Sequence, residues 1–463
     1  MMQKEVIAIF DIGKTNKKFL LFDKELKIVH EAEQKFDEIL DDDGFACDDI
    51  ERIENWMKEC VSGVILQNKF TIKALNFATY GASLMYLDKN GKRLTPVYNY
   101  LKPMPEDVLM GFYETYGGVE EFSRKTASPA LGMLNSGLQV LWLKRKKPDL
   151  FDRISVVMHF PQYLSYCFTS KIASEYTSIG CHTALWDFDN RCYHPWLKKE
   201  GIDLPLPVAN SQVYDVYFHE QTIKTGIGVH DSSSSLVPYF KGTKEQFILI
   251  STGTWCVFMN PFNTESLSTD QLKRDSLCYL SVQQQQVKSS RLFLGHIHDV
   301  NVERISKHFG VNTYYYKMVK PDTRELSWLI GNIEKRIYFQ HSFREDYIYH
   351  SVNLGIFRSF EDAYHQLIHD LVSLGMESLS LIIPADDKTE IVYISGGFAR
   401  NEIFVKLLAA WLPGKKVYTS EIDNATALGA AMVVWESAFG KEVPAIDLGL
   451  KECKREEADC KSI

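Results

Sequence analysis

The chain opens on two apolar runs, residues 6–10 and 19–22, that flank a short polar stretch. Runs of this length around a polar turn predict a β-strand, a tight turn and a second strand. Glycine in such a turn lets backbone N–H groups approach a phosphate, lysine neutralises its charge, and a carboxylate meets the metal that accompanies it. The polar stretch therefore contains candidate phosphate-binding residues: Asp11, Gly13, Lys14, Thr15, Asn16 and Lys17.

Gly13-Lys14-Thr15 also looks like the end of a Walker A loop. That loop needs a glycine five positions before its Gly-Lys pair, where this chain has Ala8, and it needs a helix to follow. Here a strand pattern follows, so we reject the Walker A interpretation. Judged on this stretch alone, an ordinary hairpin with a charged turn remains the alternative to a phosphate-binding hairpin.

The same layout recurs near the middle of the chain. Residues 246–258 comprise an apolar run, the turn Thr252-Gly253-Thr254, and a second apolar run. Such internal similarity indicates duplicated domains that face each other across a cleft. The chain is long enough for two or three domains with large cores. We expect an α/β protein with one domain over residues 1–244 and another over residues 245–463.

Two segments of the second half predict ligand-contacting helices. Residues 391–401 give a strand, the pair Gly396-Gly397 and a helix start, where glycine lets the backbone approach a flat or phosphorylated ligand. Residues 424–432 form a helix of small side chains that can pack closely beside a nucleotide. Plain close packing is an equally good reading of each segment by itself.

The least readable segment covers residues 264–357, which we interpret as an insertion of mixed structure. It contains Gly295-His296-Ile297-His298-Asp299, which would suit a metal if both histidines shared a strand face. No further ligand cluster in the sequence supports a metal there. An ordinary structural role for these histidines is the favoured interpretation.

Composition excludes several classes of function. The 463 residues are 45% hydrophobic and 24% charged, with a net charge of −8 and no basic stripe of the kind that binds duplex nucleic acid. Apolar runs are too short to span a bilayer, and the start of the chain lacks the pattern of a signal peptide. Nine scattered cysteines without a CxxC pair suggest reduced thiols. We expect a cytoplasmic protein without a nucleic-acid or membrane partner.

A candidate general base follows a glycine-containing stretch at residues 225–229. There His230-Asp231 precedes a run of serines, and Asp231 at a helix start would be held ionised by the helix dipole. A capped surface helix is the alternative. A second candidate ligand loop lies at residues 73–84, where a strand runs into the small-residue turn that begins at Tyr80.

Taken together, these motifs resemble those of the FGGY carbohydrate kinases, members of the actin-like, ribonuclease-H-like ATPase superfamily. Residues 11–16 look like the family's first phosphate motif, and residues 251–254 look like its second. Residues 395–401 look like its adenosine motif, and residues 425–431 like the helix that follows. They occur in the family's order and at about its spacing, over most of residues 6–435.

The resemblance implies two actin-like domains with a cleft between them, and transfer of phosphate from MgATP to a small-molecule sugar. It gives Asp231 the role of catalytic base and makes Asp11 and Asp231 the metal-binding carboxylates. Formation of a homodimer is left open. The implied nucleotide-binding residues are Asp11, Gly13, Lys14, Thr15, Asn16, Lys17, Thr252, Gly253, Thr254, Gly396, Gly397 and Asn401. The implied sugar-binding residues are Tyr80, Gly81, Ala82, Asn99, His230 and Asp231.

Within the family, a histidine before the catalytic aspartate is typical of rhamnulokinases and fuculokinases, so L-rhamnulose or L-fuculose is the first expectation for the sugar. Other ketoses such as xylulose or ribulose are the alternative. The chain departs from the family at Asn99-Tyr100, where relatives often carry an Arg-Asp pair that touches sugar. That departure leaves two further readings, a sugar sensor and an actin-like nucleotide-binding protein without catalysis.

Overall fold

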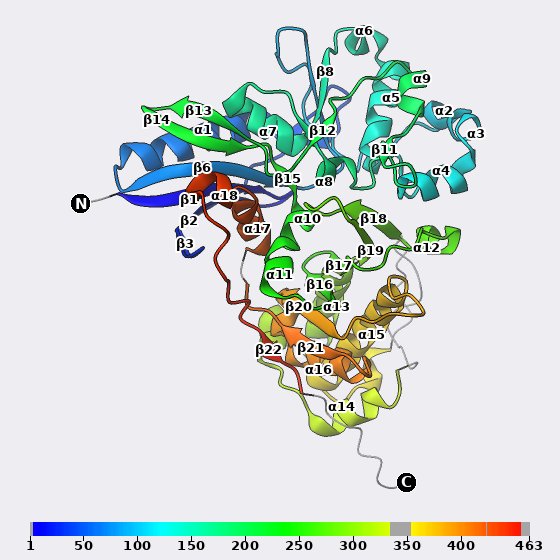
Figure 1. Cartoon of the computed structure of the whole chain (residues 1–463). Helices are drawn as coiled ribbons and strands as arrows, with labels where there is room; N and C mark the ends of the chain where they lie inside the picture. Colours follow the sequence, from blue (N-terminus) through cyan, green and yellow to red (C-terminus); the bar gives the residue numbers. More distant parts are fainter. Residues whose placement is uncertain (1–2, 334–352, 423, 455–463) are drawn as a thin grey trace.

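The computed structural model describes residues 3–333, 353–422 and 424–454. Two seven-stranded sheets lie one above the other, each with helices packed on it (Figure 1). We call each sheet with the elements packed on it the first lobe and the second lobe, in chain order. The expected α/β fold is confirmed.

The first sheet has the order β13-β14-β6-β1-β2-β3, with β15 paired to β6. Its central hairpin is antiparallel, and β6 runs parallel to β1 on the other side. The expected strand, turn and strand at the start of the chain are therefore present. The strands are β1 (Lys4–Ile12), β2 (Lys17–Phe22), β3 (Ile28–Gln34), β6 (Phe70–Thr79), β13 (Val213–Phe218), β14 (Gln221–Gly226) and β15 (Val229–His230).

The second sheet repeats this plan with the order β18-β19-β17-β16-β20-β21-β22. Its antiparallel β16–β17 hairpin matches β1–β2, and the parallel neighbour β20 matches β6. The internal repeat expected from the sequence is thus a repeat of sheet topology. The strands are β16 (Phe247–Thr252), β17 (Cys256–Asn260), β18 (Ser276–Leu280), β19 (Gln286–Leu292), β20 (Ile391–Gly396), β21 (Lys416–Thr419) and β22 (Lys451–Glu452).

Helices cover the second sheet with an apolar core formed by α13, α15 and α16. The amphipathic segment expected to begin at Ser359 is α15, and the Ser359 hydroxyl caps it by accepting the Asp362 N–H. The helices are α11 (Val237–Gly242), α12 (Thr269–Lys273), α13 (Leu294–Phe309), α14 (Thr323–Ile330), α15 (Phe360–Ser380) and α16 (Glu402–Ala410), with 3-10 turns η2 (Thr313–Met318), η4 (Leu354–Ile356) and η5 (Gly397–Arg400).

The interpretation of residues 264–357 as an insertion was wrong for its first part. Residues 276–280 and 286–292 are β18 and β19, which extend the second sheet, and α13 packs against α15. Residues 334–352 lie outside the described residues. The alternation of apolar and polar residues that predicts a strand is missing here, because Ser276, Lys288 and Ser290 are buried polar residues.

The first lobe carries a further helical block with its own apolar cluster, which includes Phe112, Trp142 and Trp196. This block, with α2, α3, α4, α5 and α9, lies at the upper right in Figure 1. The helices and short strands of the first lobe comprise this block and elements outside it, such as α1 and α7, which pack on the sheet. They are β4 (Ile39–Leu40), β5 (Ala46–Cys47), α1 (Ile50–Leu66), β7 (Leu84–Leu87), α2 (Glu106–Leu109), α3 (Phe112–Thr115), α4 (Gly118–Thr126), η1 (Gly132–Leu134), α5 (Ser136–Lys146), α6 (Pro148–Phe151), β8 (Val156–His159), α7 (Phe160–Thr169), β9 (Ser174–Glu175), α8 (Tyr176–Ile179), β10 (Trp186–Asp187), β11 (Cys192–Tyr193), α9 (Trp196–Lys199), β12 (Pro207–Val208) and α10 (Asp231–Ser235).

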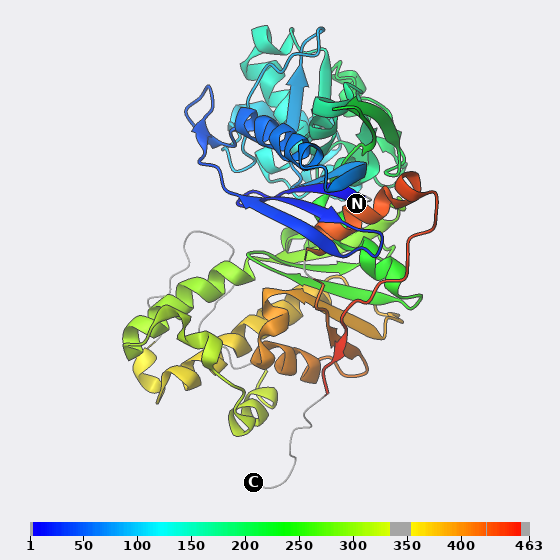
Figure 2. The same cartoon turned by 90° about the vertical axis from the view of Figure 1, so that its left-hand side faces the viewer.

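Two helices late in the chain cross from the second lobe back to the first. They are α17 (Ala425–Val433) and α18 (Trp435–Phe439), and α17 packs on β1, β6 and α10. Figure 2 shows these red helices beside the blue strands of the first sheet, before the chain returns to the second sheet as β22. The chain therefore passes between the lobes more than once, and a division at residue 244 stays a prediction.

Across residues 3–333, 353–422 and 424–454, none of the helices combines the length and the apolar character that crossing a membrane requires.

Candidate active site

Two carboxylates meet where the first sheet ends. Asp11 lies near the end of β1, and Asp231 is the first residue of α10, which follows β15. Burial, and then the negative charge of Asp231, raise the pKa of Asp11 to about 7, although Lys18 opposes the shift. The strands β1 and β15 flank β6 and end at the same level, because Ile12 and His230 both lie opposite Thr79.

The Asp231 carboxylate is anchored through one oxygen only. Its Oδ1 accepts the Ser232 N–H at 2.5 Å and lies 3.1 Å from His230 Nε2. For its Oδ2 we find no partner within the described part of the chain, and the side chain is 33% exposed. Burial lowers the pKa of His230, so its ring is neutral near pH 7. Asp231 thus has one fixed carboxylate oxygen and one that is open to a ligand.

The first turn closes through a hydrogen bond from the Gly13 N–H to the Asn16 carbonyl at 2.9 Å. Thr15 is exposed at its tip, whereas Asn16 Oδ1 is buried without a hydrogen-bond partner in the described residues. The turn is therefore tight and faces outward, as a phosphate-binding turn requires.

The two lysines of this turn behave differently from the expectation that they contact phosphate. Lys17 is 1% exposed, and its ammonium donates to Asp48 Oδ1 at 2.8 Å and to the Lys14 carbonyl at 2.9 Å. Lys14 donates to Asp48 Oδ2 at 2.8 Å and pairs with Glu38 at 2.9 Å. Tyr80 donates its hydroxyl to the same Asp48 oxygen at 2.7 Å. Asp48 thus ties the first turn to the loop that begins at Tyr80.

We expect Asp48→Asn to lower the free energy of unfolding by about 2 kcal/mol, because the buried Lys17 ammonium loses its anionic partner while the amide oxygen still accepts one hydrogen bond. Urea unfolding measures the change. Glu38→Gln is the matched control, because Glu38 is half-exposed and its removal should cost under about 0.5 kcal/mol. Equal stability of the two variants would show that Asp48 does not hold the turn.

The second turn is joined to the Gly396-Gly397 loop. Thr252 donates its hydroxyl to the Ser395 carbonyl and accepts the Phe398 N–H at 3.0 Å. Gly396 has φ of +85°, and a Cβ there would lie 1.9 Å from the Thr252 carbonyl oxygen. Only glycine fits so close to the backbone of β16, so the turn and the loop form one packed unit.

A cavity of about 550 Å³ lies beside this unit. Asn401 caps α16 through Oδ1 and donates its amide to the Tyr364 hydroxyl at 2.8 Å, which His298 Nε2 approaches at 3.2 Å. A flat base could stack in such an aromatic and polar cavity. The residues expected to hold nucleotide that line it are Gly253, Thr254, Gly397 and Asn401, joined by Gly295 of α13.

The histidines of this region do not form the metal site considered from the sequence. Residues 295–299 belong to the helix α13, so His296 and His298 share no strand face. His296 stacks on Phe293, with ring centroids 4.6 Å apart, while His298 is buried against Tyr364. The condition for that site is not met.

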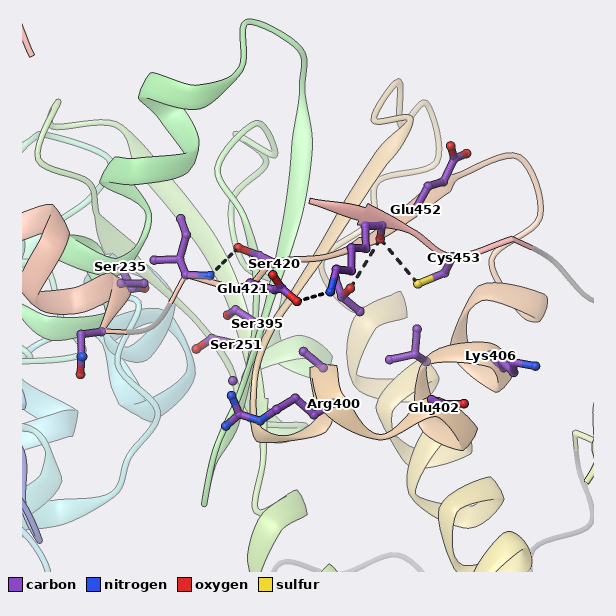
Figure 3. A pocket seen from close by; sticks show the side chains of 18 of the residues that line it. Ser235, Ser251, Ser395, Arg400, Glu402, Lys406, Ser420, Glu421, Glu452 and Cys453 are labelled. Carbon is purple, nitrogen blue, oxygen red and sulfur yellow. Dashed lines mark hydrogen bonds and ion pairs between the residues drawn. The ribbon is translucent and has the colours of Figure 1, made fainter. Parts of the chain in front are cut away.

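A larger cavity of about 1090 Å³ lies on the other side of the loop (Figure 3). Ser251 and Ser395 lie on the neighbouring strands β16 and β20 at its floor, and Glu421 pairs with Lys451 at its rim. Gly396 lines this cavity, whereas Gly397 lines the smaller one. The two glycines, expected to flank one ligand together, thus border different cavities.

The predicted sugar loop lies against the candidate base. A Cβ at Gly81 would lie 2.9 Å from Cys181 Sγ and 3.3 Å from the His230 ring, so the loop backbone touches His230 directly. Ala82 follows with φ of +58°, and its carbonyl accepts a hydrogen bond from Gln139 at 2.9 Å. The loop is held rigidly at the start of α10.

Asn99, a predicted sugar contact, has a structural role here. Its amide donates to the Ala46 carbonyl at 2.9 Å, and its Oδ1 accepts the Leu101 N–H at 3.0 Å. Both polar groups are therefore engaged inside the first lobe. Tyr80 is engaged in the same way, through its hydroxyl on Asp48.

Sequence reasoning missed two histidines near His230. Burial, and then the charge of His230, lower the pKa of His159 to about 3. Burial, and then the charges of Arg291 and His230, lower the pKa of His182 to about 3. His159 Nε2 is buried and has no hydrogen-bond partner among the described residues. These isolated residues carried no pattern in the sequence, since only the fold gathers them.

The acidic pair Asp11 and Asp231 fits a divalent cation. The charge of Asp231 adds to burial in raising the pKa of Asp11, and oxygen ligands are those that Mg²⁺ prefers. The described residues contain one acidic cluster of three, Asp41 to Asp43, but Lys102 and Lys147 already pair with it. Asp11 and Asp231 are therefore the better candidate site for a divalent cation.

Comparison with known proteins shows the family of the chain. Residues 6–208 match the model of the N-terminal domain of the FGGY family of carbohydrate kinases, and residues 342–435 match its C-terminal domain. Together the two matches cover more than half of the chain.

Similar curated proteins include a rhamnulokinase of Oceanobacillus iheyensis, 24% identical over 250 residues that make up 50% of each chain. A xylulose kinase of Staphylococcus epidermidis is 23% identical over 222 residues, 46% of this chain and 42% of that protein. The chain therefore spans about half the length of the curated relatives it matches.

Solved structures with the same fold cover the whole chain. A carbohydrate kinase from Novosphingobium aromaticivorans matches with a TM-score of 0.79 and 20% identity, over 99% of this chain and 96% of that one. A ligand-bound xylulose kinase from Lactobacillus acidophilus matches with a TM-score of 0.77 and 16% identity, over 97% and 93%. With its two domain models matched in order and its fold shared end to end, this chain belongs to the FGGY family of carbohydrate kinases.

Proposed function

We propose that the protein is an ATP-dependent sugar kinase, which transfers the γ-phosphoryl group of MgATP to a hydroxyl of a ketose. The observation that carries this proposal is the open Oδ2 of Asp231 beside the sugar loop, with Asp11 near the end of β1 on the other side of β6. A protein that only binds nucleotide needs no fixed carboxylate facing a second ligand. The membership of the FGGY family supports the same reaction.

In this reaction Asp231 Oδ2 takes the proton of the attacking hydroxyl. The His230 ring, neutral near pH 7, leaves the carboxylate basic while it fixes the other oxygen. Gly253 and Thr254 line the cavity proposed for the nucleotide and would hold its phosphates, with Asn401 and Gly397 beside the adenosine. Little covalent chemistry is required, because positioning and charge neutralisation dominate phosphoryl transfer.

Mg²⁺ would be held by Asp11 and Asp231, in the case of Asp11 through water, since Mg²⁺ dehydrates reluctantly. When bound, the ion supplies positive charge to the β- and γ-phosphate oxygens. Asp11 is well placed for this task because its strand partner Lys18 is committed to Glu31 and Asn424.

Removal of the Asp11 charge should weaken the metal site. We expect Asp11→Asn to raise the Mg²⁺ concentration that half-saturates nucleotide binding about tenfold, because an outer ligand of a metal typically contributes at least that factor. Calorimetric titration of ATP at increasing Mg²⁺ measures it. An unchanged Mg²⁺ dependence would contradict the role of Asp11.

For the sugar we propose L-rhamnulose or L-fuculose, with xylulose or ribulose as the alternative. A histidine before the base, His230, supports the first pair, as does the similarity to rhamnulokinases. The similarity to xylulose kinases supports the alternative. Neutral His159 and His182 beside His230 suit hydroxyl groups rather than anions.

A panel of ketoses tests the proposal, with ATP consumption and sugar phosphate measured separately. Strong stimulation by one ketose with matching product supports the kinase. ATP turnover that no sugar stimulates would instead support an actin-like nucleotide-binding protein. Sugar binding without product would support a sugar sensor. That alternative arises because this chain has Asn99-Tyr100 where relatives often carry an Arg-Asp pair.

A further inference from the structure

Arg291 is a charged side chain of the second lobe that the preceding roles leave unassigned. It lies on β19 opposite Val257 of β17, beside the turn of residues 252–254. Asp275 holds it through a bidentate pair, from Nε and Nη2 at 2.9 Å each. Its guanidinium also lies 5.4 Å from the ring centroid of Trp255, the residue that follows the turn. For Nη1 we find no partner among the residues that the structure describes.

The strand β18, which pairs with β19, packs on the first lobe next to the candidate base. Tyr279 of β18 lies edge-on to the His230 ring with centroids 5.8 Å apart, and the Leu280 carbonyl accepts the Ser233 hydroxyl at 2.8 Å. After burial, which raises the pKa of Cys181, the charge of Asp231 raises it further and the charge of Arg291 lowers it. Tyr100 responds to both charges in the same directions, with burial again the largest cause. Arg291 therefore lies on the hairpin that packs against the start of α10, where Asp231 stands.

The lysines of the first turn and of β2 already have anionic or polar partners. Lys14 and Lys17 are bound to Asp48, and Lys18 to Glu31 and Asn424. The charge that builds up on a phosphoryl group in transit needs a positive partner that is fixed before the reaction. A guanidinium whose plane is held by Asp275 and Trp255 meets that need with its remaining N–H groups.

We propose that Arg291 reaches across the cleft and binds the phosphoryl group as it passes from the nucleotide to the sugar. This role rests on the proposed kinase function. The sugar oxygen forms a bond to the γ-phosphorus while the bond from phosphorus to the β,γ-bridging oxygen breaks. The electron pair of the broken bond leaves with ADP, and the hydroxyl proton goes to Asp231. Arg291 donates hydrogen bonds to the equatorial oxygens and takes no proton.

Arg291→Ala should lower kcat about 10³-fold, as removal of a transition-state arginine does in other phosphoryl-transfer enzymes, while KM for ATP and for the sugar changes less than threefold. Free guanidinium added to this variant should restore part of the rate. Arg291→Lys should recover little, because one ammonium cannot reproduce the planar fork.

Binding of a transition-state mimic gives a readout other than turnover. With sugar present, the wild type should bind ADP with aluminium fluoride much more tightly than ADP alone, and Arg291→Ala should lose that difference while binding ADP normally. Arg274→Ala is the matched control, since Arg274 is half-exposed and pairs only loosely with Asp270 at 3.6 Å. Thermal unfolding of each variant checks that it is folded.

Three results would overturn the role of Arg291: a kcat within fivefold of the wild type, a loss confined to KM for the sugar, or an undiminished preference for the mimic. A loss confined to KM would make Arg291 a sugar-binding residue. If the wild type itself phosphorylates no sugar, the proposed kinase function fails. In that case tight binding of the mimic is also absent from the wild type, which separates the two failures.

Discussion

Asp231→Asn is expected to reduce kcat about 10⁴-fold for every sugar, with the affinity for metal-free ATP unchanged within twofold. A general base contributes 10² to 10⁴ in rate, and we expect the upper limit because the amide cannot accept the proton from the sugar hydroxyl. The amide oxygen can still accept the Ser232 N–H, so the start of α10 should keep its shape. The cavity proposed for the nucleotide is lined by second-lobe residues, which the substitution leaves intact.

Two measurements check this expectation: sugar-phosphate formation by a coupled assay, and ATP binding by calorimetry. Asp215→Asn is the matched control, because it makes the same chemical change at an exposed carboxylate on β13. Its turnover should equal that of the wild type. An Asp231→Asn variant that keeps more than a tenth of wild-type turnover would show that another group takes the proton.

The two hairpins could be predicted from the sequence because their signal is local. In each, two apolar runs of strand length surround a polar turn, and pairing of adjacent strands needs no distant residue. The place of Asp231 at the start of a helix could be predicted for a similar reason, since a carboxylate after a short strand and before a helix has a characteristic setting.

Partners of individual side chains could not be predicted in the same way. Lys17 sits in the first turn as a phosphate-binding lysine would, yet its ammonium binds Asp48, which the chain brings from 31 residues away. Asn99 likewise completes hydrogen bonds to Ala46 and Leu101. Tertiary packing decides which polar groups form hydrogen bonds with one another. A single sequence does not show these contacts.

The sequence did not single out Arg291 as a candidate site residue, for a further reason. Its strand has the sequence Gln286–Leu292, in which Lys288, Ser289 and Ser290 are buried although they are polar. Alternation of apolar and polar residues is the signal of a strand with one exposed face, and this strand has almost none. The residue therefore lay in a segment that resembled an insertion.

The small-residue segment α17 was predicted as a helix, but the sequence did not predict that it packs on the first lobe. Its residues pack on β1, β6 and α10 of the first lobe, and the Ser234 hydroxyl donates to the Thr426 carbonyl at 2.8 Å. A Cβ at Gly429 would lie 1.9 Å from the Ser234 carbonyl oxygen and 2.8 Å from its carbon. The contact is between backbones, so no side chain can rotate to make room. Because α10 begins with Asp231, this contact bears on the position of the base.

Gly429→Ala should therefore lower the free energy of unfolding by about 3 kcal/mol and kcat about 10²-fold. Helix propensity alone favours alanine by about 1 kcal/mol, so the sign of the change reports the close contact. Gly63→Ala in α1 is the matched control: nothing lies within 4 Å of its added Cβ, and the variant should gain about 0.5–1 kcal/mol with normal turnover. Urea unfolding and steady-state kinetics of both variants measure these effects. Stabilisation of both by similar amounts would mean that α17 and α10 are not in backbone contact, and the base would then owe its position to the first lobe alone.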